Sequence, residues 1–249
     1  AMRTVTILIP AHNEAETVGE VVRRAVEQPL PGGMAREIIL VDDGSNDSTG
    51  SIMEGLPARF PDVPMTVLHR FIRGGKGAAL REGWGRAKGD ILLIQDADLE
   101  YDAADYPTLL DPLLQGQAEM VVGSRFLGSG GKALSVRQRW ANRLLTAWAN
   151  WFTGLGLTDL EGGLKALSRE VYSRFIPVCN GFDVEAEMVL RAVKIRRSNG
   201  DPIRVVEVPV SYHPRGYAEG KKVGWCDGVW TLFLIAWLGL RQRGKMDSA

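Results

Sequence analysis

The sequence has only two cysteines and three histidines among its 249 residues, and it has no long apolar segment. Cys179 and Cys226 cannot form a disulfide framework or a cysteine-based zinc site, and so few cysteines indicate a reducing, intracellular compartment. The longest apolar run, Val229–Leu240, is 12 residues long, whereas a membrane-spanning helix needs about 20. The patterns GxSxG, HExxH and GxxxxGK[ST] are absent, which removes support for common hydrolases and P-loop proteins.

Net charge is also absent, because 30 Lys and Arg balance 30 Asp and Glu, but the two signs are unevenly placed. Residues 1–115 carry 11 basic and 18 acidic side chains, and residues 116–249 carry 19 and 12. Six of the seven tryptophans also lie in the second half. An acidic first half favours binding of hydroxyls or a metal, and a basic, tryptophan-rich second half favours phosphates and a membrane surface. Nucleic-acid-binding proteins are more often basic overall, so no nucleic acid partner is expected.

Apolar runs alternate with helical patterns along the chain. Strands are expected at Thr4–Pro10, Glu37–Val41, Met65–Arg70, Ile91–Gln95, Met120–Gly123 and Arg204–Tyr212. Helices are expected after an N-cap at Asn13 and at Ser48–Arg59, Ala78–Lys88, Asp105–Gln115, Arg137–Phe152 and Phe182–Ala192. This alternation predicts βαβ units and a mostly parallel α/β sheet.

Polar segments follow three of the predicted strands. They are Pro10–Glu14 (PAHNE), Val41–Ser45 (VDDGS) and Gln95–Glu100 (QDADLE). Parallel sheets bind ligands at the carboxyl ends of their strands, so these segments are expected to face one crevice. Asp42 or Asp43 can accept hydrogen bonds from ribose hydroxyls. Asp96 and Asp98, with Glu100, offer the hard oxygens that Mg²⁺ or Mn²⁺ prefers.

Eight segments in order carry a family resemblance: IPAHNE, VDDGSNDST, GKGAALREG, DADLE, VGSR, DLEGGLKAL, GFDVEAEM and VEVPVSYHPRG. Together they resemble the inverting family-two glycosyltransferases with a GT-A fold, most of all the branch that transfers hexoses to dolichyl or polyprenyl phosphate. The resemblance covers about residues 4–225. It implies a GT-A domain over residues 1–228, with a nucleotide-sugar-binding half (4–123) and an acceptor-binding half (124–228). An amphipathic, membrane-associated segment would follow at 229–249.

The same resemblance implies roles for individual residues. The donor nucleotide sugar would be bound by Pro10, Asn13, Glu14, Asp42, Lys76 and Asp96. The metal would be held by Asp98 and Glu100, and the acceptor phosphate by Arg125, Arg215 and either Lys221 or Lys222. The catalytic group would comprise Asp96, Asp98, Arg125, Glu185 and Glu187. Read without the resemblance, the glycine-rich segment around Lys76 is either a loop that approaches a nucleotide or an ordinary turn.

The expected reaction is metal-dependent, inverting transfer of a hexose from a donor of the GDP-mannose or UDP-glucose type to polyprenyl or dolichyl phosphate. A divalent ion would neutralise the charge that builds on the leaving diphosphate. A lipid phosphate is already an anionic nucleophile, so basic residues that hold it are needed more than a base. The alternative is a hydroxyl acceptor, for which Glu185 or Glu187 would be the general base. A sugar nucleotidyltransferase and a non-enzymatic scaffold are further alternatives.

Tryptophans and basic residues are interleaved in the second half. Trp140, Trp148 and Trp151 share one stripe of a predicted helix, and Trp230 and Trp237 lie in the terminal apolar run before Arg241 and Arg243. Tryptophan favours the headgroup layer of a membrane, and Lys and Arg attract anionic lipid. A core position is the alternative for the first stripe. We therefore predict a cytoplasmic protein that is peripheral at the cytoplasmic membrane face.

Overall fold

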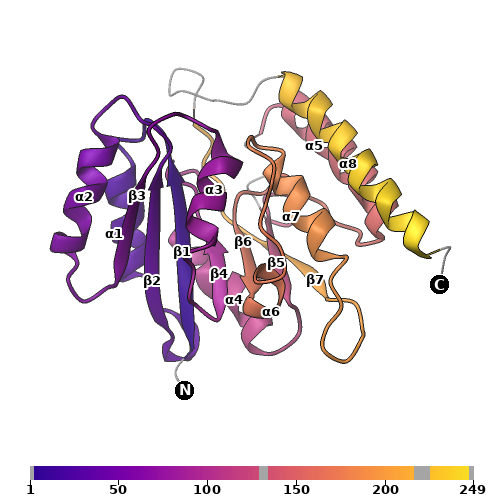
Figure 1. The fold of residues 1–249 in the computed structure, drawn as a ribbon, viewed down its shortest axis with the longest axis horizontal. Coiled ribbons are helices and arrows are strands. Elements are labelled where there is room, and N and C mark those ends of the chain that lie inside the picture. Colours follow the sequence, from indigo (N-terminus) through magenta and orange to yellow (C-terminus); the bar gives the residue numbers. More distant parts are fainter. Residues whose placement is uncertain (1–2, 129–133, 216–224, 247–249) are drawn as a thin grey trace.

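The computed structural model describes residues 3–128, 134–215 and 225–246. Its centre is a sheet with the strand order β3-β2-β1-β4-β6-β5-β7 (Figure 1). The strands are β1 (Thr4–Ala11), β2 (Ala35–Asp42), β3 (Met65–His69), β4 (Ile91–Ile94), β5 (Met120–Ser124), β6 (Lys165–Ser168) and β7 (Val205–Pro209). Only β6 pairs antiparallel, with β4 and β5. The predicted mostly parallel α/β sheet is confirmed. The four residues of β6 were not predicted, because KALS shows no strand periodicity.

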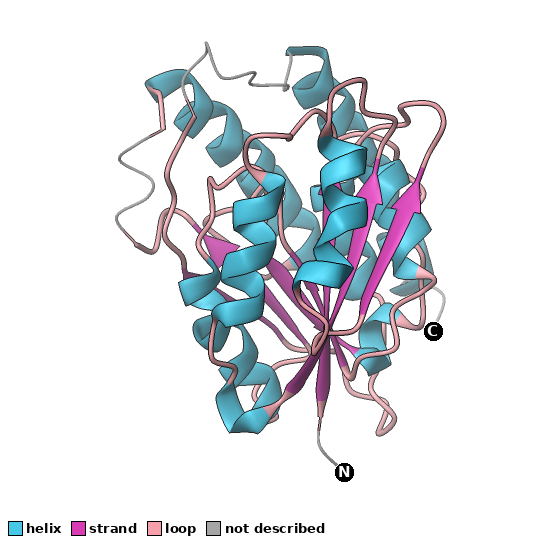
Figure 2. Cartoon of the chain, turned by 90° about the vertical axis from the view of Figure 1, so that its left-hand side faces the viewer, coloured by secondary structure: helices cyan, strands magenta, loops and turns pink. Residues whose placement is uncertain are grey.

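Helices cover both faces of the sheet (Figure 2). They are α1 (Val18–Glu27), α2 (Thr49–Arg59), α3 (Lys76–Trp84), α4 (Tyr106–Leu114), α5 (Val136–Thr153), α6 (Arg169–Tyr172), α7 (Val184–Ala192) and α8 (Trp225–Met246), with short 3-10 turns at Pro31–Gly33 and Ala103–Asp105. Side chains of α1, α2 and α4 form a hydrophobic core with one face of the sheet. Side chains of α3, α5, α7 and α8 form a second core with the other.

Three helices, α1, α3 and α7, begin two or more residues from the predicted position, α7 at Val184 instead of Phe182. Asn13 is not an N-cap, and its φ is 54°. Helix α1 begins only at Val18, after a turn in which the backbone carbonyl of Glu14 accepts the N–H of Val18. Helix α3 begins at Lys76, two residues early. The backbone N–H groups of Gly74 and Gly75 both donate to the Asp43 carboxylate, at 2.9 and 2.7 Å. This carboxylate fixes the turn that places Lys76 in the first helical position.

The terminal helix α8 belongs partly to the core. Ile235 and Leu238 are buried in it, and a Cβ at Gly239 would lie 2.3 Å from the Phe152 ring, so α8 and α5 approach each other closely. The helix begins at Trp225. The predicted boundary between residues 228 and 229 therefore falls inside one helix. No helix in the described part of the chain combines the length and apolar character needed to span a bilayer.

Candidate active site

The loops that follow β1 and β2 are joined by hydrogen bonds at the carboxyl edge of the sheet. Asn13 donates its backbone N–H to Ser45 Oγ at 3.0 Å, and its side-chain oxygen accepts the N–H of Asn46 at 2.9 Å. Asp42 accepts the N–H of Ser45 at 3.0 Å. Pro10 lies on β1 beside β2 in the register of the pair. The predicted donor-binding residues of these two loops thus lie together, and their role in binding the donor stays a prediction.

Arg215 connects the first of these loops to the loop after β4. Its guanidinium lies 2.9 Å from Glu14 Oε2 and 2.9 Å from Asp98 Oδ2. Burial and the neighbouring charges of Asp96 and Glu100 raise the pKa of Asp98 to about 7, and Arg215 counteracts this shift. A carboxylate in such surroundings is stabilised by a nearby cation. Arg215, which the family resemblance assigns to the acceptor phosphate, therefore lies beside Glu14 and Asp98, which are predicted to bind the donor and the metal.

The acidic group after β4 fits a divalent metal bound together with phosphates. Carboxylate oxygens are the donors that Mg²⁺ and Mn²⁺ prefer, and Mg²⁺ commonly takes one or two carboxylates while substrate phosphates complete its shell. Within the described ranges, no three His, Cys, Asp or Glu residues are arranged to hold a metal by themselves. Glu100 accepts the Tyr212 hydroxyl at 3.0 Å and the Arg215 N–H at 3.1 Å. Asp98 is engaged in the same way, by Arg215 and by the backbone N–H of Glu100 at 3.1 Å, so the role of either carboxylate as a metal ligand stays a prediction.

A buried chain of alternating charges lies behind this acidic group. Lys76 Nζ is 2.5 Å from Asp96 Oδ1 and 2.6 Å from Glu185 Oε1. The other oxygen of Glu185 pairs with Lys165, whose side chain is fully buried and also donates to the carbonyl of Gly162. Sequence reasoning missed Lys165, although a lysine inside the otherwise apolar segment GGLKALS is a usable signal. The neighbouring carboxylates of Asp96 and Glu185 raise the pKa of Lys76 despite its burial, so its ammonium group stays charged.

Arg125 and Glu187 have partners other than the predicted ones. The Arg125 guanidinium pairs with the fully buried Asp159, at 2.7 Å from Nε to Oδ2 and 2.8 Å from the terminal nitrogen to Oδ1, and it lies 5.2 Å from the centre of the Tyr212 ring. Its charge is thereby already neutralised.

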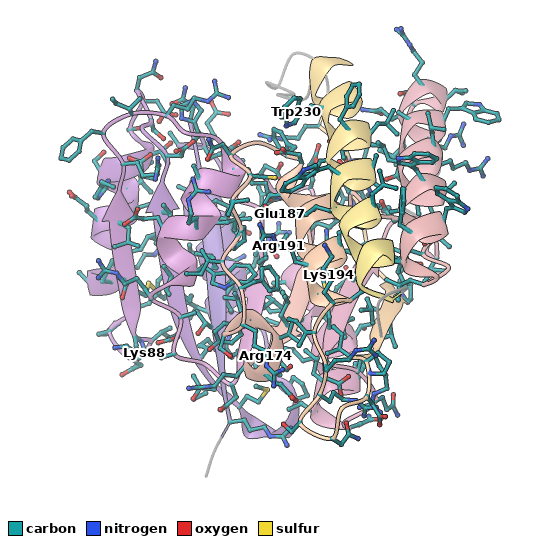
Figure 3. All side chains as sticks on the ribbon, turned by 45° about the vertical axis from the view of Figure 1, so that its right-hand side comes forward. Lys88, Arg174, Glu187, Arg191, Lys194 and Trp230 are labelled. Carbon is teal, nitrogen blue, oxygen red and sulfur yellow. The ribbon has the colours of Figure 1, made fainter. Side chains whose placement is uncertain are left out.

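The Glu187 carboxylate points toward Arg191, 2.6 Å away (Figure 3), and accepts the backbone N–H groups of Val178 and Cys179. These contacts make it a support of the loop before α7. Lys221 and Lys222 lie outside the described residues.

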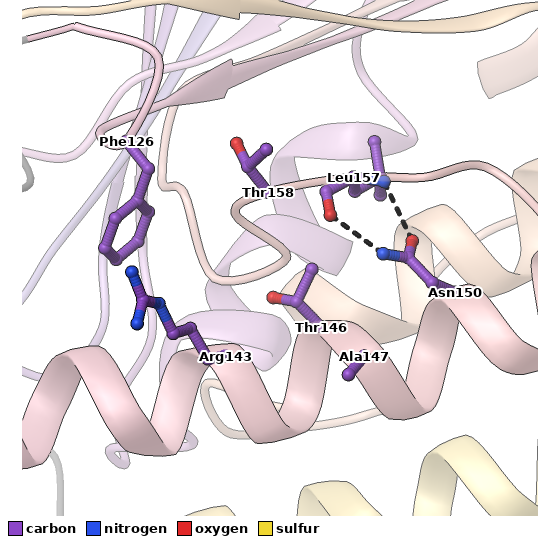
Figure 4. Close-up of a pocket in the computed structure, with 7 residues that line it drawn as sticks. All are labelled: Phe126, Arg143, Thr146, Ala147, Asn150, Leu157 and Thr158. Carbon is purple, nitrogen blue, oxygen red and sulfur yellow. Dashed lines mark hydrogen bonds between the residues drawn. The ribbon is translucent and has the colours of Figure 1, made fainter.

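Helix α5 borders two adjoining hollows that contain arginine. One is a cavity of about 300 Å³, lined by Phe126, Arg143, Thr146, Ala147, Asn150, Leu157 and Thr158 (Figure 4). The other, of about 260 Å³, is lined by Val136, Arg139, Trp140 and Arg143. Arg143 is common to both. Arg139 and Arg143 were not predicted to be phosphate ligands, because nothing in the helical stripe distinguishes a pocket-lining arginine from a solvated one.

The family model described as glycosyl transferase family 2 matches residues 6–176, which includes the strand-end loops and the buried charge chain as far as Lys165. The chain belongs to glycosyltransferase family 2. It is a glycosyltransferase, and the predicted family and enzyme class are confirmed. In this glycosyltransferase, the acidic residues Asp42 and Asp96 lie at the carboxyl ends of the parallel strands β2 and β4.

Curated relatives of this glycosyltransferase include enzymes named for lipid phosphates. It is 31% identical to the polyprenol monophosphomannose synthase of Mycolicibacterium smegmatis over 98% of its own length and 89% of that protein. It is 29% identical to the glycosyltransferase AglD of Haloferax volcanii, of which it spans only 38%. It is 30% identical to an undecaprenyl-phosphate 4-deoxy-4-formamido-L-arabinose transferase of Pseudomonas aeruginosa, of which it spans 59%.

Solved structures show the same fold. Glucosyl-3-phosphoglycerate synthase of Mycobacterium tuberculosis with UDP superposes with a TM-score of 0.67 at 24% identity, over 97% of this chain and 80% of that one. The mannosyltransferase PcManGT of Pyrobaculum calidifontis, in complex with GDP-Man and Mn²⁺, superposes with a TM-score of 0.57 at 24% identity, over 84% and 55%. The predicted GT-A fold is confirmed.

Proposed function

We propose that this glycosyltransferase moves a hexose, with inversion, from a nucleoside diphosphate sugar to a polyprenyl phosphate, with Mg²⁺ or Mn²⁺ as cofactor. The observation that carries the proposal is the match to a polyprenol monophosphomannose synthase over nearly the full length of both chains. The site supports it. Asn13 and Asp42 lie where a nucleoside would be bound, and Asp98 lies in the adjacent loop, where a metal would hold the diphosphate.

The bound metal would neutralise the negative charge that develops on the leaving diphosphate. The chain's own residues orient the reactants around it. Arg215, held by Glu14 and Asp98, fixes the loops after β1 and β4 to each other at the same edge. Lys76 holds Asp96 in place through a buried ion pair. A preorganised arrangement of this kind stabilises charge in the transition state without reorganisation of the site.

The surroundings of the two glutamates favour a phosphate acceptor over a hydroxyl acceptor. A general base must be able to accept a proton at the operating pH. Glu185 lies between the ammonium groups of Lys76 and Lys165, and Glu187 is bound by Arg191 and two backbone N–H groups. Each arrangement engages both carboxylate oxygens with partners in the chain, so neither glutamate is placed to take a proton from an acceptor hydroxyl. A phosphate acceptor needs no base, and Arg139 and Arg143 border hollows that fit an anionic group.

The transfer reaction tests the proposal directly. Purified protein is incubated with radiolabelled GDP-mannose or UDP-glucose, MnCl₂ and either undecaprenyl phosphate or 3-phosphoglycerate. We expect a radiolabelled, butanol-extractable lipid with at least one of the two donors, and loss of this product when EDTA removes the metal. If product forms with 3-phosphoglycerate but not with undecaprenyl phosphate, the acceptor group is a hydroxyl and not a lipid phosphate. If no product forms with either acceptor, the proposed function is rejected.

We further propose that the protein binds the membrane through one face of α5 and α8. This aromatic face consists of Trp140, Leu144, Trp148 and Trp151 of α5 with Trp230, Phe233, Trp237 and Leu240 of α8, which are all exposed. The two helices lie side by side, with Trp230 near one end of α8 (Figure 3). Arg139 and Arg143 adjoin the face and can attract anionic headgroups. The proposed place of action is the cytoplasmic membrane face, where a free thiol such as Cys179 stays reduced.

Substitution of two aromatic residues tests this surface. The variant Trp230→Ser/Phe233→Ser should bind phosphatidylglycerol vesicles at least tenfold more weakly, since burial of each large apolar side chain contributes about 1.5–3 kcal/mol. Vesicle flotation measures the effect, and higher salt should weaken wild-type binding. Removal of all of α8 is a poorer test, because it would also open the core around Ile235 and Leu238.

Phe71→Ser provides the matched control, because Phe71 is fully exposed in the loop after β3, at the opposite edge of the sheet. It should bind vesicles like the wild type. Equal flotation of all three proteins would contradict the membrane surface. A concentration-dependent dimer that disappears only in the double variant would assign the aromatic face to a second copy of the chain instead.

A further inference from the structure

Glu161 contains a buried oxygen without a hydrogen-bond partner. In the ranges 3–128, 134–215 and 225–246, its Oε1 forms no hydrogen bond, and the side chain forms no ion pair. The two cations whose charges lower its pKa are already paired, Lys165 with Glu185 and Arg125 with Asp159. Buried polar atoms are almost always satisfied, so an orphaned carboxylate oxygen beside an active site points to a group that the chain does not supply.

The loop that carries Glu161 lies directly against Asp96. A Cβ added to Gly163 would lie 2.3 Å from Asp96 Oδ2, and the N–H of Gly163 donates to the Tyr101 hydroxyl at 2.8 Å. Asn142 accepts the N–H of Glu161 itself, at 3.4 Å. These contacts hold the loop in one position at the edge of the predicted donor site.

Strand order decides which part of the donor this loop faces. In the sheet, β4 separates β1 and β2 from β6. The nucleoside-side residues Asn13 and Asp42 follow β1 and β2, and Asp98 follows β4. Because β6 runs antiparallel to β4, with Lys165 beside Ile94, the Glu161 loop enters at the same carboxyl edge but on the far side of β4. A donor whose nucleoside lies over β1 and β2, and whose diphosphate lies at Asp98, extends its sugar toward this loop.

We propose that Glu161 binds a hydroxyl group of the transferred hexose and so contributes to the choice of donor sugar. This inference rests on the proposed function. A hexose carries several hydroxyl groups, each able to donate and to accept a hydrogen bond, whereas a polyprenyl phosphate has none outside its phosphate. A site that hydrogen-bonds a substrate hydroxyl discriminates against a sugar that lacks it, because the buried carboxyl group is then left unpaired.

The charge state of Glu161 is compatible with this role. Burial and the neighbouring charge of Glu185 raise the pKa of Glu161 to about 7. Near neutral pH the carboxyl is thus present in both forms. The protonated form donates to a hydroxyl and the ionised form accepts from it, so either form can hold the sugar.

Donor binding without acceptor tests the inference. Calorimetric titrations in MnCl₂ use GDP-mannose or UDP-glucose, whichever raises the wild-type melting temperature more, together with its 2-, 3-, 4- and 6-deoxy analogues. Wild type should bind one analogue roughly tenfold to a hundredfold more weakly than the parent sugar. The ratio of interest is the dissociation constant of that analogue divided by that of the parent sugar. In Glu161→Ala this ratio should fall to about one. In Glu161→Gln, which keeps a hydrogen-bonding group, it should remain between one and the wild-type value.

Two further readouts separate a sugar contact from a structural role. The melting temperature of Glu161→Ala without ligand should not fall, since the removed oxygen has no partner in the described structure. Glu170→Gln, a change in an acidic residue of α6 that pairs with Arg174, should leave every ratio unchanged. The inference is overturned if Glu161→Ala keeps the wild-type ratio for all four analogues, or if its only effect is on turnover with acceptor. Because no acceptor is present, these results do not depend on the lipid transfer that tests the proposed function.

Discussion

Asp98→Asn is expected to lower the rate of transfer by roughly a thousandfold or more, because the metal and its diphosphate lose their carboxylate anchor. The amide keeps the shape of the side chain but not the charge. The fold should persist, since Arg215 retains Glu14 as a partner when Asp98 is neutral. Steady-state transfer assays at saturating MnCl₂, with thermal melts of both proteins, measure the two effects separately. Titration of Mn²⁺ by electron paramagnetic resonance should show weaker metal binding.

A nearby aspartate serves as the control for this substitution. Asp102 lies four residues further along the same segment and accepts the N–H of Ala104 at 3.0 Å as the cap of a 3-10 turn. Asp102→Asn should change stability little, because Asn caps a helix about as well as Asp, and should leave the rate within a few-fold of wild type. Comparable rates for Asp98→Asn and wild type at saturating Mn²⁺ would remove Asp98 from the metal site.

Lys165→Met is expected to lower the free energy of unfolding by about 3–5 kcal/mol, which is the usual cost of removing one partner from a buried ion pair. Lys165 is fully buried, and its loss leaves Asp96 and Glu185 to share the single charge of Lys76. For a chain of this size the melting temperature should fall by about 6–20 °C. Urea unfolding and differential scanning calorimetry measure the change.

The double variant Lys165→Met/Glu185→Gln should recover part of this loss. One positive and one negative charge then remain, Lys76 and Asp96, which are 2.5 Å apart. Lys88→Met, at an exposed position, should change the free energy of unfolding by less than about 0.5 kcal/mol. If the double variant is no more stable than Lys165→Met, the unpaired charge of Glu185 is not the cause of the loss; if Lys165→Met is as stable as wild type, the charge chain has no part in stability.

The sequence alone predicted much of the framework of this protein. The runs before Pro10, Asp42 and Asp96 are short and mostly apolar, which is typical of buried strands, and a turn or helix signal follows each of them. Such local signals determine where strands end, and parallel pairing then brings the ends to one edge of the sheet. The acidic strand ends and the fold class could therefore be predicted from the residues, and the ordered motifs were enough to indicate the family.

Only the tertiary structure decided which charge neutralises which. Arg125 pairs with Asp159, and Arg215 with Glu14 and Asp98, across separations of 34, 201 and 117 residues. The energy of a charged side chain depends on its burial and on its neighbours in space, and no periodicity in the chain encodes these. The same holds for α8, where one apolar helix buries Ile235 and exposes Trp230. Which face lies inward depends on where α5 and α7 pack, and that is decided by the whole fold.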